Sequence, residues 1–348
     1  MPHKILSISL GSIGKRHLRN ARTLLPDAEI AVYRQHTRGD MAVPEGANLM
    51  FSNMDEALAF TPDAVLISSP ASEHINNASE FTKRNIPMFI EKPLAANSKG
   101  IDAFLNTCRT STGFIMVGYV LRFLPALHTI RSLINNNTLG KVHTARIEVG
   151  QYLPDWRPES DYRTGVSAQE KLGGGALLEL SHEIDYATWL FGWPQSLQCS
   201  RAKLSGLEID VEDSAHIIME YADKNVAVQL DFLQRTANMA VQIVAEKGTL
   251  YADLIKEELT LVSPEYPLGK KLECEKLPNG NDIYLRQFDV LFHKSLKGYK
   301  PKYPQTSDFS EWASVQSAAH VLELVDLAKK ASDTGTRQTV AFAKAKAA

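Results

Sequence analysis

Short apolar runs and helical stretches alternate along the first third of the chain. The first run turns through Gly11 and Gly14 into a stretch whose apolar positions recur at helical spacing, and a second helical stretch covers residues 72–85. Short apolar strands that alternate with amphipathic helices are typical of a parallel sheet covered on both faces. The four runs expected to be strands lie at residues 5–10, 29–34, 63–70 and 87–93.

From about residue 120 the pattern changes to strands that follow one another directly. Residues 141–153 alternate between polar and apolar side chains, and two further pairs of alternating runs have turn signals at Asp223–Asn225 and Lys247–Gly248. Consecutive strands with tight turns indicate an antiparallel sheet. The expected fold class is therefore α/β plus α+β, with a domain on a parallel sheet over residues 1–120 and a mostly antiparallel domain over residues 121–348.

The turn after the first run has the spacing of a dinucleotide-binding fingerprint. Gly11 and Gly14 would let the backbone approach a pyrophosphate at a helix N-terminus, whereas Ser9 stands where the first glycine of GxGxxG belongs. A purely structural turn is the alternative. The residues expected to contact the cofactor here are Ser9, Gly11, Ser12, Ile13 and Gly14.

The end of the second expected strand bears on the choice between NAD and NADP. An NAD-preferring site usually has an acid here, about 20 residues further on, which binds the ribose 2′-hydroxyl. This chain has Arg34 and Arg38, and no acid before Asp40. Because a guanidinium pairs with a 2′-phosphate and a carboxylate repels it, NADP is slightly favoured over NAD; an exposed surface arginine is the alternative.

Two further motifs lie at the ends of later strands, where open α/β sheets bind ligands. The stretch "SSPASEH" supplies Ser69, Pro70 and His74 as candidates for cofactor binding, and "IEKP" supplies Glu91 and Lys92. The proline after Lys92 keeps the lysine backbone extended, and a lysine held beside a nicotinamide is suited to acid–base chemistry. A surface Glu–Lys pair is the alternative.

The most crowded stretch is "GGGALLELSHEID", residues 173–185. If residues 176–191 form one helix, His182 points away from an apolar stripe, with Glu179 one turn before it and Asp185 one turn after. A histidine among carboxylates suits a pocket, whereas an outer helix face that carries charges is the alternative. The stripe consists of Leu177, Leu180, Ile184, Ala187 and Phe191.

Composition restricts the class of protein further. The chain has 348 residues, 44% of them hydrophobic and 22% charged, as in an ordinary globular protein of two domains. A formal net charge of −2 argues against a nucleic-acid surface, and no run approaches the ~20 apolar residues of a membrane span. The first apolar run is too short for a signal peptide, so a cytoplasmic location is expected. Three separated cysteines and the absence of an HExxH spacing make disulfides and a zinc site unexpected.

Eight motifs occur in an order that resembles the glucose–fructose oxidoreductase / inositol dehydrogenase / MocA (Gfo/Idh/MocA) family. They are "SLGSIGKRHLRN", "SSPASEH", "IEKPLAAN", "GYVLRFLP", "LGKV", "GGGALLELSHEIDYATWLFG", "VEDSA" and "AEKGTLYAD", and the resemblance covers nearly the whole chain. It implies an N-terminal Rossmann domain and a C-terminal domain on a large open sheet, with a homodimer or homotetramer formed through that sheet. It also implies that Lys92 and His182 are the catalytic pair.

One departure from the family concerns the acid that accompanies the histidine. The family commonly has an aspartate four residues before it, where this chain has Leu178. Either the helix register shifts by one residue, or the role of this acid passes to Glu179 or Asp185, so both are candidates for the catalytic acid.

Residues 151–163 form a second segment rich in candidate chemistry, and prolines exclude long regular structure there. Aromatic side chains can pack against a sugar ring, and arginines can bind a carboxylate or phosphate, so a substrate-binding loop is expected. An ordinary packed loop is the alternative. Together with Arg122 of "GYVLRFLP" and with His182, the expected substrate-binding residues are Tyr152, Trp156, Arg157, Tyr162 and Arg163.

The sequence therefore indicates an NAD(P)-dependent oxidoreductase that transfers hydride between a nicotinamide and a hydroxyl-bearing carbon of a sugar, nucleotide sugar or cyclitol. Lys92 and His182 are the expected acid–base groups, and a small carbohydrate is the expected partner, with no nucleic acid, membrane or metal. The alternatives are an NAD-dependent glycosidase of the same family, a non-catalytic dinucleotide-binding sensor, and a paralogue with an empty pocket.

Overall fold

The computed structural model describes residues 2–34, 42–303 and 312–344. The chain forms two compact units, one of Met1–Phe123 with Pro278–Ala319 and the other of Leu124–Leu277 with His320–Ala348. The first break lies close to the boundary expected at residue 120. The return of residues 278–319 to the first unit was not expected, because a local sequence pattern does not reveal which domain a later helix joins.

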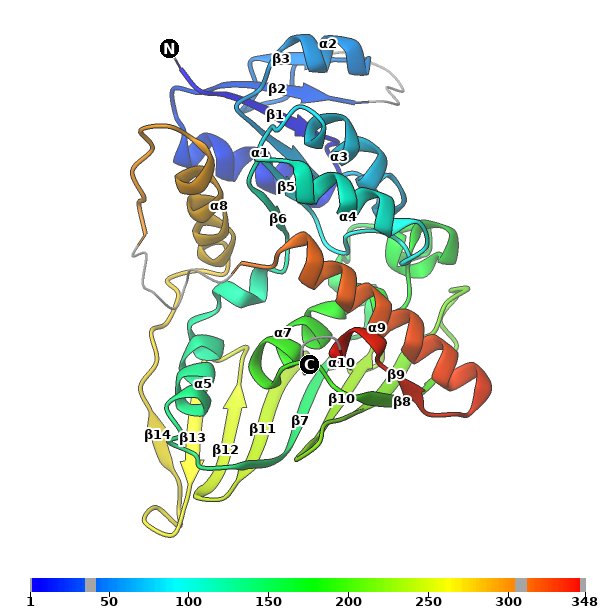
Figure 1. The fold of residues 1–348 in the computed structure, drawn as a ribbon, viewed down its shortest axis with the longest axis vertical. Helices are drawn as coiled ribbons and strands as arrows, with labels where there is room; N and C mark the ends of the chain where they lie inside the picture. The colour runs from blue at the N-terminus through cyan, green and yellow to red at the C-terminus, as the bar shows by residue number, and fades with distance from the viewer. Residues whose placement is uncertain (1, 35–41, 304–311, 345–348) are drawn as a thin grey trace. The chain divides into compact units, whose positions relative to one another are not determined.

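The first unit is built on a six-stranded parallel sheet, sheet A (Figure 1). Its order, β3-β2-β1-β4-β5-β6, is that of a Rossmann fold. The four expected strands are confirmed as β1, β2, β4 and β5, and each ends earlier than expected because its motif residues belong to the following turn. The strands are β1 (Lys4–Ile8), β2 (Glu29–Tyr33), β3 (Leu49–Phe51), β4 (Ala64–Ile67), β5 (Met88–Ile90) and β6 (Ile115–Val117).

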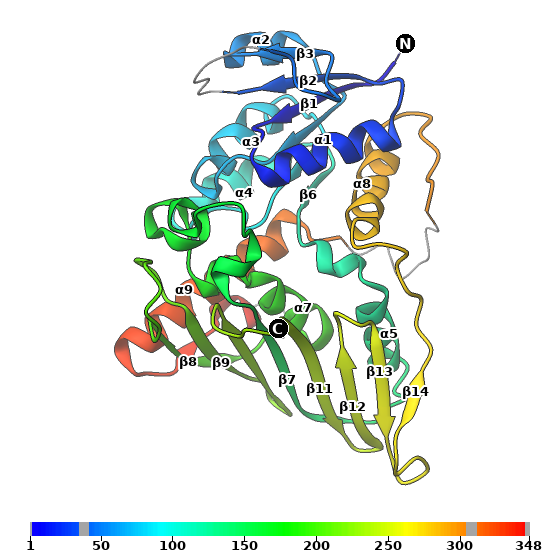
Figure 2. The same cartoon turned by 180° about the vertical axis from the view of Figure 1, so that it is seen from behind.

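Two helices far apart in sequence lie side by side in this unit. Helix α1 (Ser12–Leu24) follows β1, and helix α8 (Asp282–Ser295) from the returning segment packs against it (Figures 1 and 2). The side-chain amides of Asn20 and Asn281 join the two segments, with N···O distances of 3.3 and 2.8 Å. The unit also contains α2 (Met54–Ala59), α3 (His74–Thr82) and α4 (Ile101–Thr110).

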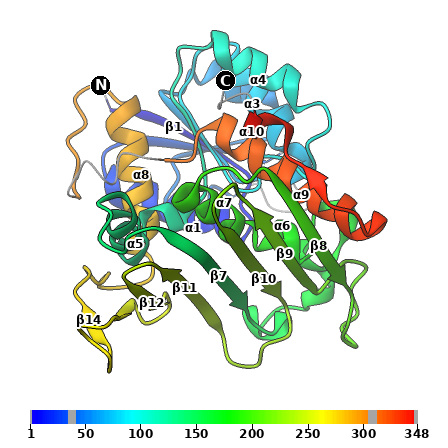
Figure 3. The same cartoon turned by 60° about the horizontal axis from the view of Figure 1, so that its bottom comes forward.

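The second unit is built on a nine-stranded sheet, sheet B, in the order β14-β13-β12-β11-β7-β10-β9-β8-β15 (Figure 3). Strands β7 and β10 run parallel, and the other neighbours run antiparallel. The two expected hairpins are confirmed as β9–β10 and β11–β12. The strands are β7 (Val142–Gly150), β8 (Ser196–Ala202), β9 (Ser214–Glu220), β10 (Asn225–Asp231), β11 (Asn238–Ala245), β12 (Gly248–Asp253), β13 (Glu258–Val262), β14 (Lys270–Leu272) and β15 (Gln338–Thr339).

Helices cover one face of sheet B and leave the other open. The register places the buried side chains of Ile243, Ala145 and Val226 in one row, and α6 (Ala176–Glu179) and α7 (Ser181–Phe191) pack on this face (Figure 3). The remaining helices are α5 (Pro125–Asn135), α9 (Val315–Thr334) and α10 (Ala341–Lys344). Across the three described ranges, no helix has the length and apolarity needed to cross a membrane.

The single helix expected over residues 176–191 is not observed, and that prediction is wrong. The chain forms α6 and α7 with a break at Leu180, whose φ is −100° and ψ is 28°. The expected stripe still faces the core, since Leu177, Ile184 and Ala187 are fully buried. The break does change the relation between Glu179, which ends α6, and His182, which lies in the first turn of α7.

Candidate functional site

The candidate cofactor site lies at the carboxyl edge of sheet A. Because β1, β2, β4 and β5 run parallel, the turns that follow them all emerge at this edge. The strand order reverses between β1 and β4, which is where doubly wound sheets bind ligands. Most of the residues expected to bind cofactor lie in these turns: Ser9, Gly11, Arg34, Ser69, Pro70, Glu91 and Lys92, with Ser12, Ile13 and Gly14 at the start of α1.

The turn after β1 adopts a glycine-like conformation despite its serine. Ser9 has a φ of 74°, in the left-handed region, and its N–H donates to the Tyr33 carbonyl of β2 at 3.0 Å. A Cβ on Gly14 would lie 2.7 Å from the Ser9 carbonyl oxygen, so the close approach of turn and helix requires glycine there. The turn therefore has the tight geometry that the fingerprint predicts.

The first turn of α1 is suited to an anion. Gly11 precedes the helix, no side chain caps its first N–H groups, and the first turn contains no acidic residue. Uncapped N–H groups and the positive end of the helix dipole favour phosphate. These residues therefore fit the pyrophosphate of a dinucleotide.

The structure describes only one of the two arginines that are expected to determine the choice between NAD and NADP. Arg34 directly follows β2, is half-buried, and donates its backbone N–H to the Phe51 carbonyl at 3.1 Å. Arg38 lies outside the described residues.

His74 joins the turn after β4 to the turn after β5. Its Nε2 lies 2.7 Å from the Ser69 carbonyl oxygen and its Nδ1 lies 2.9 Å from the Pro93 carbonyl oxygen. Burial lowers the pKa of His74, although the two carbonyl contacts and the carboxylate of Glu91 act in the opposite direction. A neutral ring donates only one of these bonds. His74 is fully enclosed and holds protein backbone, so its expected contact with cofactor stays a prediction.

Glu91 is not part of an exposed pair with Lys92 but is 7% exposed. Its Oε1 lies 2.5 Å from Nε2 of His17 on α1, and its Oε2 accepts the backbone N–H of Lys92 at 2.8 Å. Burial alone would raise the pKa of Glu91, but hydrogen bonding and charge from His17, together with Lys92, outweigh it and hold this pKa below its usual value. The side chain of Lys92 is half-buried.

His17 was missed in the sequence, although a signal for it was present. It lies on the buried face of α1 with Leu18 and Ala21, and its exposure is 0%. The rings of Phe89 and Phe288 enclose it, at centroid distances of 5.1 and 4.8 Å. A histidine among the apolar positions of an amphipathic helix needs a polar partner, and that requirement could have directed attention to it.

In the second unit the glycine run packs against protein. Gly173 and Gly175 have φ values of 86° and 101°, and a Cβ on Gly175 would lie 2.5 Å from Oε1 of Glu212. That carboxylate accepts the N–H of Leu177 at 3.1 Å, and Glu212 also pairs with Arg201 at 3.4 Å. The run therefore lets Glu212 hold the start of α6, a role for "VEDSA" that the sequence did not reveal.

The candidate acids near His182 have different environments. Glu179 accepts a hydrogen bond from the buried hydroxyl of Ser167 at 2.6 Å, whereas Asp185 is 1% exposed, beneath the surface of α7. His182 itself is half-buried. Of the two acids, Glu179 is the more accessible.

The aromatic residues of the expected substrate loop are held by neighbouring protein groups. The indole N–H of Trp156 donates to the Gln151 carbonyl at 3.1 Å, and its ring meets Phe232 edge-on at 5.2 Å. The guanidinium of Arg235 lies 3.6 Å from the ring centroid of Tyr152. Both rings therefore have defined positions in the loop.

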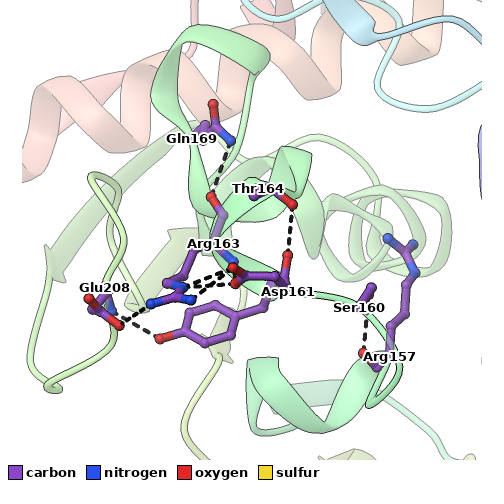
Figure 4. A network of polar contacts seen from close by, with 8 residues as sticks. Arg157, Ser160, Asp161, Arg163, Thr164, Gln169 and Glu208 are labelled. Atoms are coloured by element: carbon purple, nitrogen blue, oxygen red, sulfur yellow. Dashed lines mark hydrogen bonds and ion pairs between the residues drawn. The ribbon is translucent and has the colours of Figure 1, made fainter.

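Arg163 is held by two acidic residues, one within the loop and one outside it (Figure 4). Its guanidinium donates to the carboxylate of Asp161 at 2.8 Å and to Glu208 at 3.1 Å, and hydrogen bonds and charge from these acids raise its pKa. The hydroxyl of Tyr162 accepts the backbone N–H of Glu208 at 3.2 Å. The side chain of Arg157 points away from this network (Figure 4).

Arg122 lies in the first unit, in the short turn Val120–Phe123, and is 6% exposed. It donates to the backbone carbonyl of Trp312 at 3.3 Å. Its expected contact with substrate stays a prediction.

The fold and the glycine turn define a dinucleotide-binding protein with a second domain on a large, mostly antiparallel sheet. Two family models match the chain: "Oxidoreductase family, NAD-binding Rossmann fold" over residues 4–119 and "GFO/IDH/MocA C-terminal domain" over residues 127–251. The chain belongs to the Gfo/Idh/MocA family and is an NAD-binding oxidoreductase.

Relatives with curated descriptions include dehydrogenases. The chain is 24% identical to "Myo-inositol 2-dehydrogenase" of Thermotoga maritima over 308 residues, 84% of this chain and 88% of the relative. It is 29% identical to "Trans-1,2-dihydrobenzene-1,2-diol dehydrogenase" of Xenopus tropicalis over 163 residues, which is 46% of each protein.

Two solved structures are similar over almost their whole length. A levoglucosan dehydrogenase in complex with NADH and levoglucosan has a TM-score of 0.79 at 16% identity, covering 98% of this chain and 100% of that one. The WlbA dehydrogenase from Bordetella pertussis, in complex with NADH and UDP-GlcNAcA, has a TM-score of 0.73 at 18% identity, covering 97% and 99%. At these identities the likeness shows a shared fold.

Proposed function

We propose that the protein is an NAD(P)-dependent dehydrogenase or reductase that acts on a hydroxyl-bearing carbon of a sugar, nucleotide sugar or cyclitol. The observation that carries the proposal is the placement of Lys92. It lies at the carboxyl edge of sheet A, where the carboxylate of Glu91 accepts the backbone N–H of Lys92 and Nδ1 of His74 lies 2.9 Å from the Pro93 carbonyl oxygen. Because its backbone is held on both sides, this lysine is suited to positioning a reactive amine beside a substrate rather than to lying free in solvent.

Lys92 and His182 are the proposed acid–base groups, with Glu179 as the preferred acid and Asp185 as the second candidate. When bound, NAD(P) supplies the nicotinamide that exchanges hydride with the substrate carbon. An amine or imidazole within hydrogen-bond reach of the substrate hydroxyl takes or returns its proton. Ser167, which donates to Glu179, holds that carboxylate in place.

The names of the relatives support this class of substrate. Myo-inositol is a cyclitol, and levoglucosan and UDP-GlcNAcA are a sugar derivative and a nucleotide sugar. Tyr152, Trp156 and Arg157 are the proposed substrate-binding residues of the second unit. Arg163 and Tyr162 are assigned a supporting role instead, because Arg163 binds Asp161 and Glu208, and the Tyr162 hydroxyl binds the backbone of Glu208.

Cofactor binding is tested first, by titrating the protein with NADH and NADPH and following nicotinamide fluorescence. We expect both to bind and NADPH to bind more tightly, because Arg34 can pair with a 2′-phosphate. The variant Arg34→Asp should reverse the preference. Failure of both cofactors to bind would refute the proposal.

Catalysis is tested by following reduction of NAD⁺ and NADP⁺ with myo-inositol, levoglucosan and a panel of nucleotide sugars. Lys92→Ala and His182→Ala should each lower kcat by ~10²–10⁴-fold while cofactor binding persists. Lys99→Ala and His293→Ala, which alter exposed residues, are the matched controls. A sensor would bind cofactor without turnover, and a glycosidase would release sugar without net formation of NADH.

The open face of sheet B is the proposed surface for a homodimer or homotetramer. The strand register places five side chains on it in one row, and two of them, Ile218 and Tyr251, are 46% exposed. Ile218→Asp should lower the mass measured by sedimentation, whereas Leu268→Asp, at a fully exposed turn, should not. The row is Tyr251, Gln242, Arg146, Ala227 and Ile218.

A further inference from the structure

A single buried carboxylate connects α1 to the backbone of the proposed catalytic lysine. One oxygen of Glu91 binds Nε2 of His17 on α1, at 2.5 Å, and the other accepts the N–H of Lys92 at 2.8 Å. Because one oxygen binds α1 and the other binds the backbone of Lys92, a displacement of α1 alters the hydrogen bond that holds the Lys92 backbone.

The other end of this connection, His17, is linked through α1 to the turn of residues 9–14 that follows β1, which is the proposed dinucleotide turn. His17 lies one helical turn after Gly14, and the helix allows little change in their separation. Gly14 in turn lies so close to Ser9 that an added Cβ would be 2.7 Å from the Ser9 carbonyl oxygen, so we expect a displacement of the turn to displace the first turn of α1 and His17 with it.

The surroundings of His17 and Glu91 favour a single orientation of the histidine ring. His17 is 0% exposed, and the aromatic rings of Phe89 and Phe288 exclude water from it. Its Nδ1 is buried and has no hydrogen-bond partner among the described residues, so Glu91 alone fixes the orientation of the ring through hydrogen bonding. In such an enclosure an unpaired carboxylate is costly, and the bond to His17 is therefore retained.

We propose that His17 and Glu91 are positioning residues that couple occupancy of the dinucleotide turn to the placement of Lys92. This inference rests on the proposed function. A dinucleotide bound at the first turn of α1 restrains that helix, and the carboxylate transmits the restraint to the Lys92 backbone. By linkage, the ordered Lys92 segment strengthens cofactor binding by the same factor.

Hydrogen–deuterium exchange of the segment around residues 88–96 in the full-length protein, with and without NADH, tests the coupling without a substrate. In the wild type NADH should slow exchange there by about fivefold or more. His17→Leu and Glu91→Gln should lose most of this NADH-dependent protection and still bind NADH, with an affinity lower by about the same factor. His17→Gln, which keeps an N–H donor near the position of Nε2, should restore it.

The matched control is Asn281→Ala, which removes the amide pair with Asn20 and leaves the bonds of His17 and Glu91 intact. It should destabilise the unit and keep the protection. If a single variant fails to fold, the double variant His17→Leu/Glu91→Gln removes the imidazole and the carboxylate charge together, leaves no unpaired buried charge, and should fold without protection.

Two results would overturn proposals, and they are distinguishable. Absence of NADH binding to the wild type defeats the proposed function and the coupling together. Equal NADH-dependent protection in wild type, Glu91→Gln and His17→Leu defeats the coupling alone, and leaves Lys92→Ala as the independent test of catalysis.

Discussion

Ser9 adopts a backbone conformation that is unfavourable for its side chain. With a φ of 74° it occupies the position of a fingerprint glycine, and its N–H donates to the Tyr33 carbonyl at 3.0 Å. The sequence predicted this turn from its glycines, yet it could not reveal the cost at Ser9, because φ is decided by the packing of turn against helix.

Replacing Ser9 by glycine should stabilise the protein by up to about 1 kcal/mol, since relief of left-handed strain exceeds the added entropy of the unfolded chain. Denaturant unfolding followed by tryptophan fluorescence measures the change. Thr61→Gly, at another left-handed residue with φ of 50°, is the control for the backbone effect away from the turn. A loss of stability in Ser9→Gly would contradict the interpretation of strain.

Glu91 should make stability depend on pH in a defined direction. Because His17 and Lys92 hold its folded-state pKa below the ordinary 4.5, its stabilising contribution is fully present above that pH and is lost as pH falls through the folded value. Glu91→Gln should therefore be less stable than wild type at pH 7, and the difference should shrink below pH 4.5.

Unfolding free energies measured from pH 7 down to about pH 3 test this dependence. The control is Glu80→Gln, because Glu80 has a lowered pKa beside Lys83 and Arg84 but lies at the surface, where such pairs contribute at most about 1 kcal/mol. A stability difference for Glu91→Gln that stays constant with pH would rule out the titration of this carboxyl.

At the scale of elements, helix α6, which precedes α7 and the proposed acid–base residue His182, begins through a contact made elsewhere in the chain. Glu212 binds the N–H of Leu177 and fills the space beside Gly175, and the helix then breaks at Leu180. Local periodicity predicted one continuous helix, because the apolar stripe is the same for one helix or two. Only the packing of α6 and α7 on sheet B decides between them.

Gly175→Ala should destabilise the protein more than Gly192→Ala does. Both glycines have positive φ, at 101° and 81°, but an added Cβ meets Glu212 only at Gly175 and meets nothing within 4 Å at Gly192. The difference between the two losses of unfolding free energy therefore measures the clash with Glu212 separately from the backbone strain. Overpacking of this kind costs about 1–3 kcal/mol. Urea unfolding of the two variants measures it, and equal losses would show that Glu212 moves aside.

At the scale of the whole molecule, the returning helix α8 completes the first unit. Phe288 of α8 lies against the rings of His17 and Phe89, at 4.8 and 5.0 Å, and is fully buried. The sequence placed residues 278–319 in the second domain by default, since chain order is the only guide when contacts are unknown. The tertiary contacts assign them to the Rossmann unit.

Phe288→Ala should destabilise the first unit by about 3–5 kcal/mol, because it opens a cavity beside the buried His17–Glu91 pair. Calorimetry measures the loss of stability. NADH affinity should fall as well, because the His17–Glu91 pair is proposed to connect α1 and the dinucleotide turn to Lys92. Phe342→Ala, in the second unit against Trp193 and His320, is a control that should leave NADH affinity unchanged. A Phe288→Ala protein with unchanged stability would contradict the assignment of α8 to this core.

The sequence by itself determined the parallel and antiparallel domains, the glycine turn, the β9–β10 and β11–β12 hairpins and the candidate lysine and histidine. These depend on periodicity and turn chemistry, which act over a few residues. Only the tertiary structure decided that His17 binds Glu91, that Glu212 holds α6, that Arg163 is bound by Asp161 and Glu208, and that α8 returns to sheet A. Each of these contacts joins side chains or segments that belong to different elements of the chain. Whether they come together depends on tertiary packing, which a pattern over a few residues does not encode.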